Sequence, residues 1–240
     1  MSHIHLDFAA LTERQRYKLL IGSVIPRPIA FVTTIDREGT VNAAPYSFFN
    51  CLSADPPIVA LGIEYRAGLN SKDTGRNIRE TEEFTVNIVS DAIVEAMNVG
   101  AVPFGPDVDE IEKAGLTSAP GVAVACPRIA ESPAAFECRR YVTLEIGRSR
   151  EIVLGTVLGM HIREDALDRS NFHVDPAVID AIGRMGGHGY ARTRDRFDLP
   201  TMTVADSAAK ALMVSMTSYI SCNWNEPFLA EMFTSTPRAS

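Results

Sequence analysis

The sequence has few cysteine and histidine residues, and neither type is grouped. Four Cys and five His occur in 240 residues, with no C-x-x-C pair, no H-x-x-x-H pair and no Cys/His cluster. A metal site needs several such ligands at close spacing, so none is expected. In a cytosolic protein, widely spaced cysteines are expected to be buried or half-buried free thiols, here Cys51, Cys126, Cys138 and Cys222.

The sequence also lacks long apolar runs and an excess of positive charge. No segment has the roughly 18 uninterrupted apolar residues of a membrane span, and the start shows no secretory signal. Lys and Arg total 23 against 30 Asp and Glu, for a net charge of −7, and no basic stripe carries interleaved aromatic residues. We therefore expect a cytoplasmic globular protein that binds neither nucleic acid nor a membrane.

Three common catalytic or nucleotide-binding motifs are missing. The sequence has no G-x-G-x-x-G, Walker or G-x-S-x-G motif, which argues against a Rossmann domain, a phosphotransferase and an α/β-hydrolase. It has no triad-like group of side chains either, so no catalytic side chain is assigned. With 240 residues, 46% of them hydrophobic, the chain can form one domain with excursions, or two small domains.

The most informative stretch is 26–57, PRPIAFVTTIDREGTVNAAPYSFFNCLSADPP. Residues 28–35 are rich in β-branched and aromatic residues and predict a buried strand. After a polar tip at 36–39, a second strand is predicted over 41–52, where short polar side chains mix with aromatic ones. Such a strand suits a planar ligand that also needs hydrogen bonds. An edge strand with one solvated face would have the same composition.

The rest of the chain predicts strands interrupted by short helices. Thr12 is expected to cap a first helix, and Ser71 or Asp73 to cap another over 71–78. The segment 100–121 is rich in Gly and Pro and is expected to form an exposed excursion. Further strands are predicted over 58–63, 84–90, near 129, and over 136–146 and 152–162, and further helical segments over 91–97 and 107–113.

Two features are predicted toward the end of the chain. Asp175-Pro176 is a helix start signal, and the helix is expected to reach Ile182 before a flexible, glycine-rich segment, 184–190. Residues 201–240 change to Ser, Thr, Ala and Met with little charge. We interpret 1–200 as the main domain and 201–240 as a C-terminal extension of unassigned role, with a helix over 206–216.

Six short motifs occur in one order along the chain. Together they resemble the signature of the flavin reductase-like, FMN-binding split-barrel family, which includes reductase components of two-component monooxygenases and flavoredoxin-type electron carriers. The resemblance implies a mainly β fold: an antiparallel, Greek-key split β-barrel with peripheral α-helices, assembled as a homodimer. The motifs are PRPIAFVTT (26–34), N-x-APYSFFN (42–50), S-x-DPP (53–57), KDT (72–74), NIRET-x-EF (77–84) and RMGG (184–187).

The resemblance implies an FMN phosphate site at the helix that starts near residue 71. Lys72 would supply an ammonium beside the free amides of the helix N-terminus, with the hydroxyls of Ser71 and Thr74 next to it. Arg27, between two prolines, would be a further phosphate or ribityl contact. An ordinary capped surface helix and a surface arginine are the alternative interpretations.

The flavin ring is expected to lie along the 41–52 strand and the turn that follows it. In the family this strand lines the flavin, so Ser47, Asn50 and Ser53 would offer hydrogen bonds to the ring edge. Phe48 or Phe49 would lie against its face, and Thr33 would contact it from the opposing strand. Only about half of these side chains can face one ligand, because successive side chains of a strand alternate between its faces.

The activity implied by the resemblance is NAD(P)H-dependent flavin reduction, with hydride passing from nicotinamide C4 to flavin N5. The substrate side would be formed by His161 and by Arg184, Met185 and Tyr190 of a segment that closes over the flavin; a structural histidine and a plain glycine-capped helix end are the alternatives. The partner would be a flavin-dependent monooxygenase. Two other functions stay open: an FMN electron carrier without NAD(P)H oxidation, and a barrel that binds another flat ligand.

Overall fold

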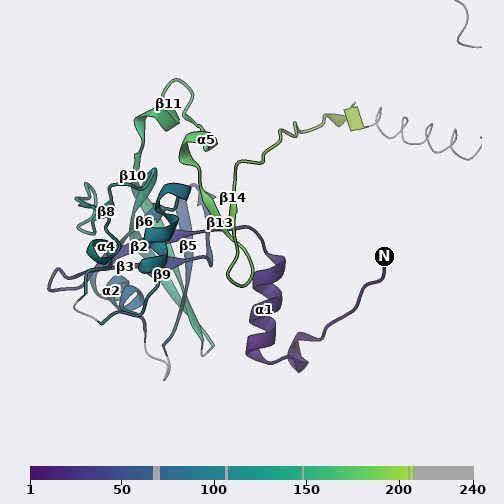
Figure 1. The fold of residues 1–240 in the computed structure, drawn as a ribbon, viewed down its shortest axis with the longest axis horizontal. Coiled ribbons are helices and arrows are strands. Elements are labelled where there is room, and N and C mark those ends of the chain that lie inside the picture. The colour runs from purple at the N-terminus through teal and green to yellow at the C-terminus, as the bar shows by residue number, and fades with distance from the viewer. Residues whose placement is uncertain (67–70, 106–107, 148, 205, 208–240) are drawn as a thin grey trace, which may run out of the picture. The chain divides into compact units, whose positions relative to one another are not determined.

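The computed structural model describes residues 1–66, 71–105, 108–147, 149–204 and 206–207 (Figure 1). Met1–Asp195 forms one compact unit, and Arg196–Ser240 is a second unit that is considered by itself. Most of the predicted helix over 206–216 lies outside the described residues. Among those described, no helix is long and apolar enough to cross a membrane.

A seven-stranded, wholly antiparallel sheet dominates the first unit. Its strand order is β3-β2-β6-β9-β10-β5-β4. The prediction of a mainly β, antiparallel fold with peripheral helices is therefore confirmed. The strands are β2 (Ala30–Ile35), β3 (Val41–Tyr46), β4 (Phe49–Ala54), β5 (Pro57–Glu64), β6 (Glu83–Ile88), β9 (Ala134–Ile146) and β10 (Arg150–Ile162).

The two edges of this sheet lie close together. β3 and β4 are the edge strands, yet only Ser47 and Phe48 connect them. Three residue steps from Tyr46 to Phe49 span at most about 11 Å, so the sheet must curl into an open barrel. The Phe48 carbonyl accepts a hydrogen bond from the Gly62 amide at 2.7 Å and holds the link against β5. The single strand predicted over 41–52 is therefore wrong: the chain leaves one sheet edge and joins the other.

Apolar side chains fill both faces of β2. Val32 is buried inside the barrel with Leu61, Phe84 and Val153. Its neighbour Phe31 points to the opposite face, in a second buried cluster, as side-chain alternation requires. Burial on both faces explains why the sequence of this strand is continuously apolar rather than alternating. The second cluster also contains Ile29, Val89, Met97, Ile111, Ile129 and Ile182.

Short helices surround the barrel. Thr12 caps α1 (Glu13–Ser23) through a capping box with Gln15, as predicted. The predicted cap of α2 (Asp73–Thr81) is wrong: Lys72 is the N-cap residue and makes no side-chain capping bond. Ser71 instead accepts a bond from Arg79. The other helical segments are η1 (Phe8–Ala10), η2 (Asp91–Ile93), α3 (Val94–Val99), α4 (Glu110–Lys113), η3 (Glu164–Ala166) and α5 (Pro176–Ile179).

The segment after α5 is a β-hairpin. Asp175 caps α5 as predicted, but the helix stops at Ile179 because Asp180 adopts a left-handed conformation with φ of 45°. Strand β13 (Ile182–Arg184) then pairs with β1 (Arg27–Pro28) and β14 (Tyr190–Arg192). The predicted helix through Ile182 is therefore wrong, and residues 185–189 connect β13 to β14 in a hairpin. The remaining short strands are β7 (Ser118–Ala119), β8 (Arg128–Ile129), β11 (Leu167–Asp168) and β12 (His173–Val174).

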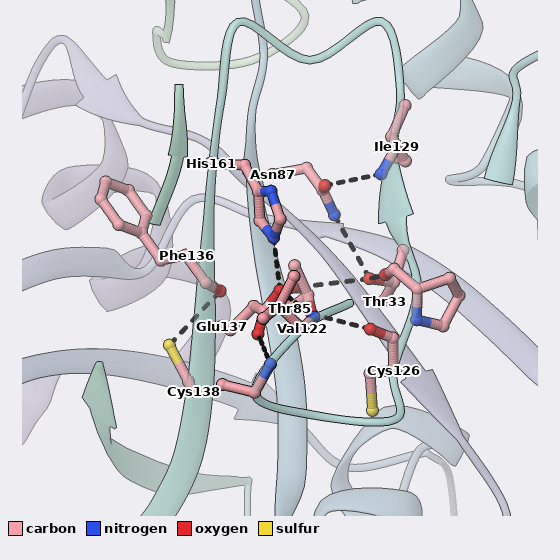
Figure 2. Close-up of polar contacts among 12 residues, drawn as sticks. Thr33, Thr85, Asn87, Val122, Cys126, Ile129, Phe136, Glu137, Cys138 and His161 are labelled. Carbon is pink, nitrogen blue, oxygen red and sulfur yellow. Dashed lines mark hydrogen bonds and ion pairs between the residues drawn. The ribbon is translucent and has the colours of Figure 1, made fainter. Parts of the chain in front are cut away.

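A row of polar side chains on the outer face of the sheet holds the loop before β8 (Figure 2). Thr33 donates to the Pro127 carbonyl, and Thr85 donates to the Cys126 carbonyl at 3.2 Å. Asn87 accepts from the Ile129 amide at 2.8 Å. These side chains satisfy backbone groups that have no strand partner.

Glu137 ends this row with a carboxylate that is almost wholly buried. It accepts hydrogen bonds from the amides of Val122, at 2.7 Å, and Ala123, and its Oε1 pairs with Nε2 of His161 (Figure 2). Burial raises the pKa of the Glu137 carboxyl, but these bonds outweigh burial and hold it below its usual value.

The cysteines of the described chain are free thiols. Cys126 and Cys138 are buried, and burial raises the pKa of Cys126 to about 12, so these thiols are unreactive near neutral pH. Cys51 is exposed on β4, which corrects the expectation that it is buried or half-buried. Cys222 lies outside the described residues.

Candidate functional site

Two large cavities lie on either side of the link between β3 and β4. One, here called the polar cavity, has a volume of about 590 Å³ and lies against β3, the start of α2 and residues 100–104. The other, here called the apolar cavity, has about 610 Å³ and lies between the end of α1, β1, β5 and the turn between β9 and β10.

One end of the polar cavity lies at the N-terminus of α2. Lys72 lines it at the N-cap of α2, and within the described part of the chain its side chain makes no capping bond to the first amides of that helix. Thr74 lies in the first turn, and its hydroxyl accepts a hydrogen bond from Nδ2 of Asn42 at 3.0 Å. Asn42, Ala44 and Tyr46 face the cavity together because they alternate along β3.

Buried polar groups line the same cavity. The Tyr46 hydroxyl is buried beside the Thr74 hydroxyl, and burial raises its pKa above the usual value although the contact with Thr74 acts in the opposite direction. Burial also raises the pKa of Glu110, whose Oε2 accepts a hydrogen bond from the Ala43 amide at 2.9 Å.

Apolar and aromatic side chains also line the polar cavity. They are Tyr17 of α1, Pro45 of β3, and Val102, Pro103 and Phe104. The cavity therefore combines two cations, Arg66 and Lys72, and three carboxylates, Glu64, Asp73 and Glu110, with apolar surface. Such a lining suits a ligand that has both polar and apolar parts.

A stack of three side chains separates the two cavities. The rings of Tyr17 and Phe48 lie 6.4 Å apart with an angle of 20° between their planes. The Arg150 guanidinium lies 4.2 Å from the Phe48 ring centroid and 5.9 Å from that of Tyr17. Because Tyr17 lines the polar cavity while Phe48 and Arg150 line the apolar one, the stack is a wall shared by both.

Arg27 is a clamp beside the apolar cavity. Its guanidinium donates to the carbonyls of Ile21 at 2.6 Å, Val24 at 2.9 Å and Met185 at 3.1 Å, and to the Ser47 hydroxyl at 3.4 Å. Only one of the five guanidinium N–H groups is left over. Burial lowers the pKa of Arg27, and its bonds join α1, the β13–β14 hairpin and the β3–β4 link.

The structure divides the predicted cofactor residues between different cavities. Lys72 and Thr74 line the polar cavity, whereas Arg27, Ser47, Phe48 and Asn50 line the apolar one. Ser71 lines a third cavity of about 400 Å³ with Arg66, Arg76, Arg79 and Glu80. Thr33 belongs to the outer polar row, and Ser53 is exposed on β4; neither lines one of these three cavities.

The predicted substrate residues lie outside the three cavities. His161 pairs with Glu137 on the outer face of the sheet. Arg184 covers the ring of Tyr190 with its guanidinium 4.4 Å from the centroid, and it donates to the Gly187 carbonyl at 2.8 Å. Met185 contributes a carbonyl to Arg27.

Sequence reasoning missed several lining residues. Asn42 and Tyr46 carried a signal, because they belong to the N-x-APY motif and share one face of β3. Arg66, Glu110 and Arg150 carried none, because only the folded chain brings them to the cavities.

Comparison with known proteins agrees with this architecture. The model of the flavin reductase-like domain matches residues 21–178. A protein of Deinococcus radiodurans of uncharacterised function is 47% identical over 211 residues, which cover 85% of this chain and 92% of that protein. The chain therefore belongs to the flavin reductase-like family, which confirms the resemblance inferred from the motifs.

Solved structures show the same fold. Nitrilotriacetate monooxygenase component B from Bacillus cereus is 33% identical, with a TM-score of 0.79 over 83% of this chain and 100% of that one. The 2-nitrobenzoate 2-nitroreductase of Pseudomonas fluorescens is 37% identical, with a TM-score of 0.77 over 84% of this chain and 98% of that one. The flavoredoxin of Desulfovibrio vulgaris, at 22% identity, covers 84% of this chain and all of its own with a TM-score of 0.66 and shows the fold alone.

Proposed function

We propose that the protein is an NAD(P)H-dependent flavin reductase that holds FMN in the polar cavity. The observation that carries this proposal is the uncapped N-terminus of α2 with Lys72 beside it, opening into a cavity that has a flat apolar wall. Membership of the flavin reductase-like family supports it. FMN is favoured over FAD because the sequence lacks an adenine-binding motif.

Different residues of the polar cavity fit different parts of FMN. Lys72, Thr74 and the first amides of α2 would bind the phosphate. Tyr17, Pro45 and Phe104 offer apolar surface to the isoalloxazine ring, and the side-chain oxygen of Asn42 offers a hydrogen-bond acceptor, since its NH₂ group donates to Thr34 and Thr74. Bound FMN would supply hydride acceptance from the nicotinamide at N5. The chain itself binds and orients, so no nucleophile or general base is required.

This assignment moves part of the predicted site. Ser47 and Asn50 line the apolar cavity, and Phe48 forms the side of the Tyr17–Phe48 wall that faces that cavity, so in the proposal these side chains do not contact the FMN ring. Arg27 acts by fixing the β3–β4 link rather than by binding phosphate.

The reduced flavin would serve a partner oxygenase, and the protein would act as a homodimer in the cytoplasm. The oxygenase is suggested by the likeness to nitrilotriacetate monooxygenase component B. An electron carrier is the competing function, and it differs in one measurable property: it does not oxidise NAD(P)H.

The test begins with the visible spectrum of the purified protein and the mass of the released cofactor. FMN is expected. Anaerobic mixing with NADH or NADPH in a stopped-flow instrument should then bleach the flavin absorption with saturation kinetics. A flavin that neither nucleotide reduces would support the carrier, and a protein that binds no flavin when FMN is added would overturn the proposal.

A further inference from the structure

Two neighbouring threonines of β2 point to opposite faces of the sheet. Thr33 and Thr34 are both fully buried, and successive side chains of a strand alternate between its faces. Thr33 donates to the Pro127 carbonyl and holds the loop before β8 (Figure 2). Thr34 makes its contacts on the other face, where its Oγ1 lies 3.1 Å from Nδ2 of Asn77 and 3.4 Å from Nδ2 of Asn42. The contacts of Thr33 hold a loop, whereas those of Thr34 lead to the polar cavity.

A chain of hydrogen bonds connects Thr34 to Thr74 at that cavity. The NH₂ group of Asn42 has two hydrogens, and its Nδ2 lies 3.4 Å from Oγ1 of Thr34 and 3.0 Å from Oγ1 of Thr74. Both hydrogens are therefore used within the protein. Asn77 of α2 is 2% exposed and supports Thr34 through a further bond. Asn42 and Thr74 line the cavity, and the buried Thr34 and Asn77 lie behind them.

The direction of these bonds decides what the cavity offers to a ligand. A hydroxyl group has one hydrogen to donate. Because Oγ1 of Thr74 accepts from Asn42, its own hydrogen is available to an acceptor in the cavity, such as a phosphate oxygen. Without the bond to Thr34, the Asn42 amide could rotate and accept the Thr74 hydrogen on its own Oδ1. The Thr74 hydroxyl would then be lost to the ligand.

We propose that Thr34 is a positioning residue for the cofactor phosphate: it holds the Asn42 amide, which leaves the Thr74 hydroxyl free to donate to FMN. This inference rests on the proposed function, which places the phosphate beside Lys72 and Thr74. It adds a source of selectivity, because the bond from Thr74 is made to FMN and not to riboflavin, which has no phosphate. The Lys72 ammonium is a point charge on a flexible stem, whereas a directed hydroxyl fixes where the phosphate lies.

The experiment is fluorescence titration of the full-length, flavin-free protein with FMN and with riboflavin. Thr34→Val removes the hydroxyl at nearly constant volume. It should weaken FMN binding about three- to tenfold, the equivalent of one hydrogen bond, and leave the affinity for riboflavin unchanged. Thr34→Ser keeps the hydroxyl and should retain the wild-type affinity for FMN. Thr33→Val is the matched control: the same substitution on the other face should lower stability and change neither affinity.

A double-mutant cycle tests whether Thr34 acts through Thr74. Thr74→Val should weaken FMN binding about tenfold or more, because it removes a bond to a charged group. Adding Thr34→Val to this variant should cause no further loss, since residues that act through one contact are not additive. Asn42→Ala removes the link from the cavity side. It should lower the preference for FMN over riboflavin, and it provides the same test if Thr34→Val does not fold.

Four results would overturn the proposal. They are a wild-type preference for FMN over riboflavin in Thr34→Val, the same preference in Asn42→Ala, equal losses for the two flavins, and additive effects of Thr34→Val and Thr74→Val. A protein that binds no FMN would overturn the proposed function together with this inference. If FMN binds as expected and neither nicotinamide nucleotide reduces it, only the proposed reductase activity is overturned.

Discussion

Lys72 occupies a position at which most helices have a residue that stabilises them. A lysine side chain has no acceptor and cannot cap α2, whereas Ser, Thr, Asn or Asp at an N-cap contributes about 0.5–2 kcal/mol. The chain thus forgoes helix stability at the point where an anion would bind the free amides. Stability and ligand binding should therefore respond in opposite directions when this residue is changed.

Replacing Lys72 by serine should raise stability and weaken FMN binding. The serine hydroxyl can cap α2 and should add about 0.5–1 kcal/mol to the free energy of unfolding of the flavin-free protein. Loss of the ammonium should weaken FMN binding about ten- to hundredfold, and by less at high salt. Denaturant melts and fluorescence titration measure the two effects.

Two further variants separate charge from capping at this position. Lys72→Ala should weaken FMN binding as much as the serine variant does without the gain in stability. Lys113→Ala, at an exposed lysine at the end of α4, should leave FMN affinity unchanged. A Lys72 variant with the wild-type dissociation constant for FMN would remove this residue from the site.

Glu137 should make stability depend on pH. Because its folded-state pKa lies below the usual value, ionised Glu137 stabilises the fold above the unfolded pKa, about 4.3. This contribution is lost as pH falls from there through the folded pKa. Glu137→Gln should cost about 1.5–3 kcal/mol near neutral pH, and the difference from wild type should shrink below about pH 4.

Urea melts of both proteins between neutral pH and pH 3 test this prediction. Glu95→Gln, which changes an exposed carboxylate of α3, is the control and should track the wild type throughout. A Glu137→Gln variant whose deficit stays constant down to pH 3 would contradict the proposed linkage.

At the scale of elements, α2 depends on a glycine that faces a buried carboxylate. A methyl group at Gly75 would overlap Oε1 of Glu151. Glu151 is wholly buried and is paired with Arg79 at 2.5 Å between Oε2 and Nη2, so it has little room to move. Gly75→Ala should therefore destabilise the protein by about 1–3 kcal/mol, although alanine is the better helix former.

Gly22 in α1 is the matched control. Nothing lies within 4 Å of the position of its added methyl group, so Gly22→Ala should raise stability by about 0.5–1 kcal/mol. Denaturant melts of the two variants compare the same substitution in two helices. A Gly75→Ala variant as stable as Gly22→Ala would show that Glu151 does not pack against α2 in solution.

Several of the helices and strands can be predicted from local sequence signals. The capping box of Thr12, the Asp175-Pro176 start signal and the apolar run of β2 act over a few residues, so the sequence predicts them directly. The break at Ser47-Phe48 could not be predicted, because the two halves of the run differ in partners rather than in propensity: β3 pairs with β2 and β4 with β5.

The candidate site was predictable only in part for the same reason. Lys72 and Thr74 lie in one short motif, and the structure places both in one cavity. Arg150 enters the apolar cavity only because β10 pairs with β5, which is 86 positions earlier where Arg150 meets Glu64. No local pattern marks such a contact.

At the scale of the whole molecule, the long strands β9 and β10 expose several apolar side chains. Tyr141, Leu144, Leu158 and Met160, which belong to β9 and β10, are 42–66% exposed. Exposed apolar residues along one pair of strands are candidates for an interaction surface. The proposed homodimer supplies an occupant for it, and aromatic residues contribute most to such interfaces.

Replacing Tyr141 by arginine should therefore shift the protein from dimer to monomer. Loss of a central aromatic contact, with burial of a charge, should cost at least about 2 kcal/mol, or roughly thirtyfold in the dimer dissociation constant. Sedimentation velocity over a range of concentrations measures the shift. Phe172→Arg is the control, because Phe172 is 79% exposed but lies between β11 and β12, so this variant should sediment as wild type does. A wild-type monomer, or a Tyr141→Arg variant with unchanged dimer affinity, would place the apolar residues of β9 and β10 outside any self-association surface.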